Sequence, residues 1–199
     1  MLVCPGTLSA RGNGIKDCGP EEEGWVLLFC TTDGAFSSAV LSSTSGSYSH
    51  VGIYERGRGV WEATPEAGVT CTPLEDFLTS AADADGHPRV DAFKVNAPFD
   101  EDFLRKRLSQ LEGRPYDRAF DPGDDQIYCS ELVQLCFHSP DGTPLFETIP
   151  MTFRDSKGRL VRYWKHYYRS LGRKIPEGRP GTNPSALAAS PLLIQVQLP

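Results

Sequence analysis

Residues 127–137, I-Y-C-S-E-L-V-Q-L-C-F, contain the most informative pattern in this sequence. The apolar positions recur at helical spacing and predict a helix with one face turned to the interior, formed by Leu132, Val133, Cys136 and Phe137. The opening of the same helix carries a thiol, a hydroxyl and a carboxylate in succession, at Cys129, Ser130 and Glu131. A helix anchored in the core would therefore present Cys129 at its N-terminus.

A cysteine in this position has chemical consequences. Unpaired backbone N–H groups and the positive end of the helix dipole both favour the thiolate, which is the reactive form. The same N–H groups can stabilise an oxyanion that forms on a substrate carbonyl. The pattern therefore indicates Cys129 as a nucleophile, and the alternative is an ordinary buried cysteine at a helix start.

A cysteine nucleophile needs a histidine base and a third group that orients the base. His50, in Y-S-H-V-G-I-Y, opens a predicted strand, and a strand holds a base rigidly. Glu62, in V-W-E-A-T, lies on the next predicted strand across the turn R-G-R-G, so it can face the His50 strand in a sheltered place. The other histidines fall in a turn, after a helix and in a late aromatic-rich helix: His87, His138 and His166.

The remaining patterns predict an α+β fold, with an antiparallel sheet or small barrel packed against helices. Strands are expected at 25–30, 50–55, 60–64, 68–71 and 89–95, and helices at 32–43, after Thr72, after Asp100 and from Cys129. Thr72 to Glu75 has the form of a capping box. The length of 199 residues favours a lead-in at 1–23 and a single domain at 24–199, which ends in a Pro- and Gly-rich extended wrap.

Composition excludes several classes of protein. The formal charge of −6 gives no global attraction to nucleic acid or anionic lipid. A basic cluster at 154–173 is interleaved with aromatic residues, and we interpret it as a solvated helix face over an aromatic core stripe. No apolar run is long enough for a membrane span. Residues 1–23 lack an apolar signal region, which predicts a cytoplasmic protein as written, or a periplasmic or exported one if the true N-terminus is missing.

The six cysteines have irregular spacings and no C-x-x-C pair. This argues against a zinc ribbon or a disulfide scaffold and favours a reducing compartment. A metal site formed by Cys129, His50 and Glu62 is a minor alternative, because no short-spaced ligand pair supports it. We therefore expect neither a metal nor an organic cofactor.

Six motifs, in this order, resemble the YiiX/YebB-like branch of the NlpC-type, papain-like cysteine hydrolases. The resemblance is to the circularly permuted form, in which the histidine precedes the cysteine. The motifs span residues 24–184 and are G-W-V-L-L-F, Y-S-H-V-G-I-Y, V-W-E-A-T-P-E-A-G-V, Y-D-R-A-F, I-Y-C-S-E-L-V and I-P-E-G-R-P-G-T-N-P. One departure is Trp25, which follows Gly24 where the family often has an acidic residue.

The resemblance implies a papain-like fold and roles for several residues. It implies Cys129 as nucleophile, His50 as general base and acid, and Glu62 as the group that orients the imidazole. It further implies that Tyr128 lies beside the site and assists the oxyanion, and that an aromatic residue of the late segment lines the pocket, for which Tyr163 is the candidate. Glu131 is expected to serve the helix structure rather than the triad.

The implied reaction is hydrolysis of an amide through a thioester intermediate. The sequence shows no wall-binding module, export signal or hydrophobic anchor, which favours a small amide such as an N-acyl amino acid or a short peptide. The alternatives are a lipid-directed acyltransferase or thioesterase of the same superfamily, and a binding module that keeps the fold without turnover. The sequence leaves the oligomeric state open.

Overall fold

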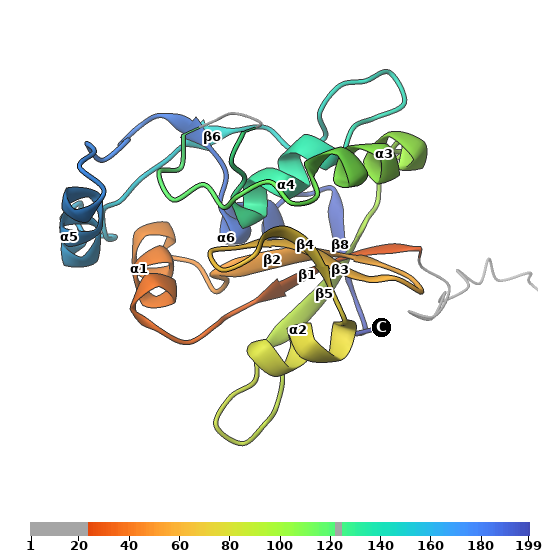
Figure 1. The fold of residues 1–199 in the computed structure, drawn as a ribbon, viewed down its shortest axis with the longest axis horizontal. Coiled ribbons are helices and arrows are strands. Elements are labelled where there is room, and N and C mark those ends of the chain that lie inside the picture. Colours follow the sequence, from red (N-terminus) through yellow and green to blue (C-terminus); the bar gives the residue numbers. More distant parts are fainter. Residues whose placement is uncertain (1–23, 122–124) are drawn as a thin grey trace, which may run out of the picture.

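A six-stranded antiparallel sheet forms the centre of the molecule in the computed structural model, which describes residues 24–121 and 125–199 (Figure 1). The strand order is β4-β3-β2-β1-β5-β8. The strands are β1 (Trp25–Cys30), β2 (His50–Glu55), β3 (Gly59–Thr64), β4 (Gly68–Thr72), β5 (Val90–Val95) and β8 (Leu193–Val196). The sheet is open, with β4 and β8 at its edges, so the predicted α+β class is confirmed in its sheet form rather than as a closed barrel.

Six helices surround the sheet in the described residues. They are α1 (Ala35–Thr44), α2 (Leu74–Ser80), α3 (Glu101–Leu111), α4 (Cys129–Cys136), α5 (Arg162–Ser170) and α6 (Pro184–Ala188). A short second sheet pairs β6 (Ile149–Pro150) with β7 (Pro180–Gly181). None of the helices described is long and apolar enough to cross a membrane.

Each face of the sheet packs against different helices, because side chains alternate along β1. Trp25, Leu27 and Phe29 belong to the main core with α3 and α4, whereas Val26 and Leu28 pack with Phe77 of α2 on the opposite face. In Figure 1, α3 and α4 accordingly lie on one side of the sheet and α2 on the other. This arrangement brings the start of α4 to β2 and β3, which carry His50 and Glu62.

A third apolar cluster lies outside the sheet and joins α1 to α5. Its buried members are Ala39, Met151, Phe153, Trp164 and Tyr168. The Trp164 indole N–H donates a 2.8 Å hydrogen bond to the Ser43 hydroxyl of α1. Of the predicted aromatic stripe, Trp164 and Tyr168 are therefore buried and Tyr163 and Tyr167 are half-buried, and the stripe attaches α5 to α1 at one end of the molecule (Figure 1).

Two local predictions need correction. Thr72 does not cap α2, because the N-cap is Pro73 and no side chain caps this helix. Thr72 is instead the last residue of β4, and its hydroxyl hydrogen-bonds the Glu62 carboxylate. The C-terminal segment is ordered as predicted, but it is more than an extended wrap, since it contains α6 and adds β8 to the sheet edge. By contrast, Asp100 caps α3 as expected and accepts a 2.9 Å bond from the Phe103 N–H.

Candidate active site

His50 and Glu62 form a sheltered pair on adjacent strands. The distance between His50 Nε2 and Glu62 Oε2 is 2.7 Å, and the two side chains are 15% and 8% exposed. The β2–β3 register pairs Ile53 with Trp61, so His50 and Glu62 project from the same face as diagonal neighbours. The hairpin expected from the sequence therefore brings the base and the carboxylate into direct contact.

Electrostatics of the pair favour the charged forms. Burial acts to lower the pKa of His50, but hydrogen bonds with Cys129 and Glu62 raise this pKa well above its ordinary value. Burial acts to raise the pKa of Glu62, but the hydrogen bond with His50 outweighs it, and the net effect is a lowered pKa. The Thr72 hydroxyl adds a further bond to this carboxylate. The pair therefore stabilises the imidazolium that forms when His50 takes up a proton.

Cys129 completes the cluster from the other side of the imidazole. It is the first residue of α4, and its side chain hydrogen-bonds His50. Because Glu62 occupies Nε2 of the ring, Nδ1 is the nitrogen left for the thiol. The N–H groups of Cys129 and Ser130, which begin α4, have no carbonyl partner within the helix. Glu131 serves the helix start, because its carboxylate accepts a 3.4 Å bond from the Tyr128 N–H.

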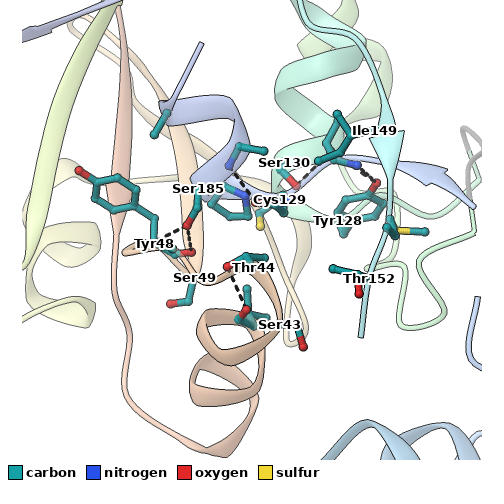
Figure 2. Close-up of a pocket in the computed structure, with 18 of the residues that line it drawn as sticks. Ser43, Thr44, Tyr48, Ser49, Tyr128, Cys129, Ser130, Ile149, Thr152 and Ser185 are labelled. Carbon is teal, nitrogen blue, oxygen red and sulfur yellow. Dashed lines mark hydrogen bonds between the residues drawn. The ribbon is translucent and has the colours of Figure 1, made fainter. Parts of the chain in front are cut away.

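The thiol opens onto a cavity of about 670 Å³. Figure 2 shows Cys129 at the centre of the lining residues, with Ser185 of α6 on one side and Tyr128 on the other. Much of the wall is apolar, and this part comes from Phe36, Val40, Phe93, Phe120, Ile149, Met151, Phe153 and Trp164. Hydroxyl groups supply most of the polar lining, and among the described residues that line the cavity there is no Asp, Glu, Lys, Arg or His. The cavity is therefore suited to an uncharged, largely apolar group.

Tyr128 is held in a buried cluster of hydroxyl groups beside the thiol. Its phenol oxygen accepts a 3.0 Å bond from the Thr182 N–H, and the Thr182 hydroxyl donates to Ser130 at 3.1 Å. Burial raises the pKa of Tyr128 to about 12, so the phenol stays protonated at neutral pH. A buried phenol that already accepts one bond retains its own O–H as a donor.

The structure places Tyr163 one layer behind the cavity. Its ring packs on Phe36, with centroids 6.3 Å apart, and the adjacent Trp164 is the residue of α5 that lines the cavity. Two further lining residues, Tyr116 and Phe120, were not singled out from the sequence. Both belong to Y-D-R-A-F, and that motif was the signal that could have identified them.

The other histidines are remote from the thiol chemistry. His87 is on an exposed loop beside Asp83, and His138 contacts the Gly142 carbonyl and the Phe103 ring. His166 is exposed on α5. Among the described cysteines, Cys30 interacts with the site, but burial raises the pKa of its thiol to about 11, which makes it a poor nucleophile. Cys4 and Cys18 lie outside the described residues.

In the described parts of the chain, one set of three side chains is spaced to share a metal ion: Asp83, Asp85 and His87. Their ligand atoms lie within 4.8 Å of one another on the partly exposed loop before β5. Among the described residues, Cys129, His50 and Glu62 do not form such a set, because the imidazole stands between the thiol and the carboxylate. This geometry suits a proton relay rather than a chelate.

Comparison with protein families gives a match to residues 22–197, and the matching family is described as "permuted papain-like amidase enzyme, YaeF/YiiX, C92 family". The chain belongs to this family. The resemblance seen in the sequence motifs is therefore confirmed, and the chain is a member of a papain-like amidase family of cysteine hydrolases.

A solved structure agrees with the fold of this permuted papain-like amidase. The crystal structure of the metalloprotein YiiX from Escherichia coli O157:H7 is similar, with a TM-score of 0.73 and 24% identity, over 89% of this chain and 97% of that one. Comparison with curated proteins finds no match. The structural likeness shows that the two proteins share a fold over nearly the whole of this chain.

Proposed function

We propose that this protein hydrolyses an amide bond through a thioester on Cys129, with His50 as general base and acid and Glu62 as the orienting group. The observation that carries the proposal is the continuous contact from the Cys129 side chain to His50 and from His50 Nε2 to Glu62 at 2.7 Å. Membership in an amidase family supports the same chemistry. Residues 24–199 would act as one hydrolase domain.

The first half of the reaction forms the thioester. His50 takes the proton of the Cys129 thiol, and the thiolate attacks the amide carbonyl to form a C–S bond. The raised pKa of His50 favours this step, because Glu62 stabilises the imidazolium that forms. Collapse of the tetrahedral intermediate breaks the C–N bond, and the amine leaves with the proton from His50.

The second half restores the enzyme. His50 accepts a proton from water, and the resulting hydroxide attacks the thioester. The C–S bond then breaks, the acid product leaves, and His50 returns the proton to the Cys129 sulfur. In both halves, negative charge develops on the carbonyl oxygen. The N–H groups that begin α4 and the neutral phenol of Tyr128 are the donors we assign to this charge.

The cavity favours an N-acyl amino acid over a short peptide as the substrate class. The acyl group remains attached to Cys129 after the amine leaves, so it must occupy the space around the sulfur. That space is about 670 Å³ and largely apolar, and the described lining contains no acidic or basic side chain. A charged peptide would find no partner there, whereas an aliphatic or aromatic acyl chain would bury apolar surface.

Site-resolved alkylation with iodoacetamide tests the nucleophile. We expect Cys129 to react faster at neutral pH than the partly exposed Cys71, whose pKa is raised by burial. His50→Ala should remove this advantage, and Cys129→Ala should lower hydrolysis of an N-acyl amino acid by roughly a thousandfold or more. Cys71→Ala is the matched control and should leave turnover unchanged. Full turnover by Cys129→Ala would refute the proposal.

A second candidate is a lipid-directed thioesterase or acyltransferase, and the same cavity favours it. The two candidates differ in the bond broken and in the acceptor of the acyl group. An acyl-thioester substrate and an N-acyl amino acid with the same acyl chain, assayed side by side, would separate them. Faster turnover of the amide supports the first candidate, and transfer to an alcohol or amine in place of water supports the second.

A further inference from the structure

The segment 156–176 differs in charge from the rest of the chain. It contains seven of the twenty Lys and Arg residues and none of the 26 Asp and Glu residues. The remaining sequence therefore has thirteen basic against 26 acidic residues. The overall charge of −6 conceals this separation, which is why the net charge suggests no attraction to an anionic surface.

The basic side chains of this segment are largely free of internal partners. Arg159 pairs with Asp155, and Arg173 pairs with Asp121, each at 2.7 Å. The other five are exposed and form no ion pair with the described residues: Lys157, Arg162, Lys165, Arg169 and Lys174. Three of them, Arg162, Lys165 and Arg169, recur at helical spacing on α5, opposite the buried Trp164 and Tyr168.

The position of α5 relates this basic face to the cavity. Figure 1 shows α5 at one end of the molecule, outside α1 and away from the central sheet. Trp164, on the inner side of α5, lines the cavity that contains Cys129. Of the four large apolar side chains exposed in the described residues, Leu160 lies two residues before the start of α5 and Ile149 lines the cavity. A surface bound to the outer side of α5 would therefore lie close to the cavity wall.

We propose that the basic face of α5, defined by Arg162, Lys165 and Arg169, docks this protein on an anionic membrane surface. Charge complementarity supports an anionic partner, because five unpaired cations gather on an otherwise acidic molecule. The choice of a membrane rests on the proposed function, since an apolar acyl chain is concentrated in a lipid phase. The aromatic rings of α5 pack on one another and on Phe36, so they are not presented for stacking on nucleic-acid bases.

Vesicle sedimentation tests the docking surface, with the full chain in a Cys129→Ala background so that binding is measured without turnover. We expect binding to phosphatidylcholine vesicles that contain phosphatidylserine, weaker binding at high salt, and little binding to phosphatidylcholine alone. Each Lys or Arg near such a surface contributes about fivefold to partitioning. The triple variant Arg162→Gln/Lys165→Gln/Arg169→Gln should therefore bind about a hundredfold more weakly.

The matched control removes three exposed basic residues on other elements and reaches the same net charge. It is Arg56→Gln/Arg58→Gln/Lys106→Gln, on the β2–β3 turn and on α3, and it should retain vesicle binding. Equal loss in both triple variants, or no binding of the parent to anionic vesicles, would overturn the proposal. So would binding to an RNA oligonucleotide that depends on α5 without binding to vesicles. Vesicle binding together with inactive Cys129-intact protein would instead refute the proposed hydrolysis alone.

Discussion

At the scale of single residues, the His50–Glu62 pair links the chemistry of the site to the stability of the fold. The lowered pKa of Glu62 means that its stabilisation is present above the ordinary pKa of 4.5 and is lost as the pH falls through the folded-state value. The raised pKa of His50 has the opposite effect on how stability changes with pH. Its stabilisation is complete below the ordinary value of 6.5 and is lost as the pH rises through the folded-state pKa.

Glu62→Gln should therefore have a pH-dependent effect. We expect the free energy of unfolding of wild type to exceed that of the variant above pH 4.5, with the difference shrinking as the pH falls below this value. Activity at neutral pH should drop by about tenfold to a thousandfold, because the imidazole loses its orienting charge. Urea unfolding across pH measures the first effect. Glu66→Gln, on an exposed turn, is the control, and a pH-independent difference would contradict the linkage.

At the scale of elements, Gly52 sets the packing of the β2–β3 hairpin that carries the base and its carboxylate. It lies between His50 and Tyr54 on the same face of β2, which is the face covered by α2. A Cβ added here would lie 2.4 Å from a Val60 methyl and 3.1 Å from the Phe77 ring. The glycine in Y-S-H-V-G-I-Y is therefore required by close packing rather than by an unusual backbone angle.

Gly52→Ala should force β2 away from β3 and α2. We expect a loss of about 1–3 kcal/mol in stability, typical of overpacking in a core. A lower turnover should accompany it, because the His50–Glu62 distance would lengthen. Gly24→Ala is a suitable control, since its Cβ would meet nothing within 4 Å. Chemical denaturation with an activity assay checks both effects, and equal behaviour of the two variants would argue against this account.

At the scale of the whole molecule, the C-terminal segment forms part of the cavity wall and one edge of the sheet. Its helix α6 lines the cavity through Ser185 and Ala186, and its strand β8 covers the outer edge of β5. Leu193 packs on the main core, and Val196 packs on the opposite face of the sheet. Residues near the end of the chain therefore contribute both to the site and to the sheet.

A chain that ends at Ser190 should keep α6 but lose β8. We expect a decrease of about 2 kcal/mol or more in stability, because three partly buried aliphatic side chains, Leu192, Leu193 and Val196, and the β5 edge pairing are removed. Thermal unfolding would record this as a Tm several degrees lower. A chain that ends at Val196 keeps β8 and should match wild type. An unchanged Tm in the shorter chain would show that β8 contributes little.

Local patterns in the sequence were sufficient for the elements that carry the chemistry. The apolar run of β1 and the alternation of β2 gave the observed strand limits, and Asp100 marked the start of α3. The helix from Cys129 was also evident, because its apolar spacing and its polar opening are properties of neighbouring residues. The hairpin turn between β2 and β3 then made the contact of His50 with Glu62 an expected one.

Other features depended on contacts between distant segments. Packing against α1 determines which face of α5 is turned inward. It places Trp164 at the cavity and Tyr163 behind Phe36. Thr72 bonds Glu62 across the sheet instead of capping the next helix, because the carboxylate of a neighbouring strand competes for its hydroxyl. Periodicity along one helix or strand tells which side is apolar. The cavity beside Cys129 has walls from α1, β6, α5 and α6, and such a space exists only after these elements pack together.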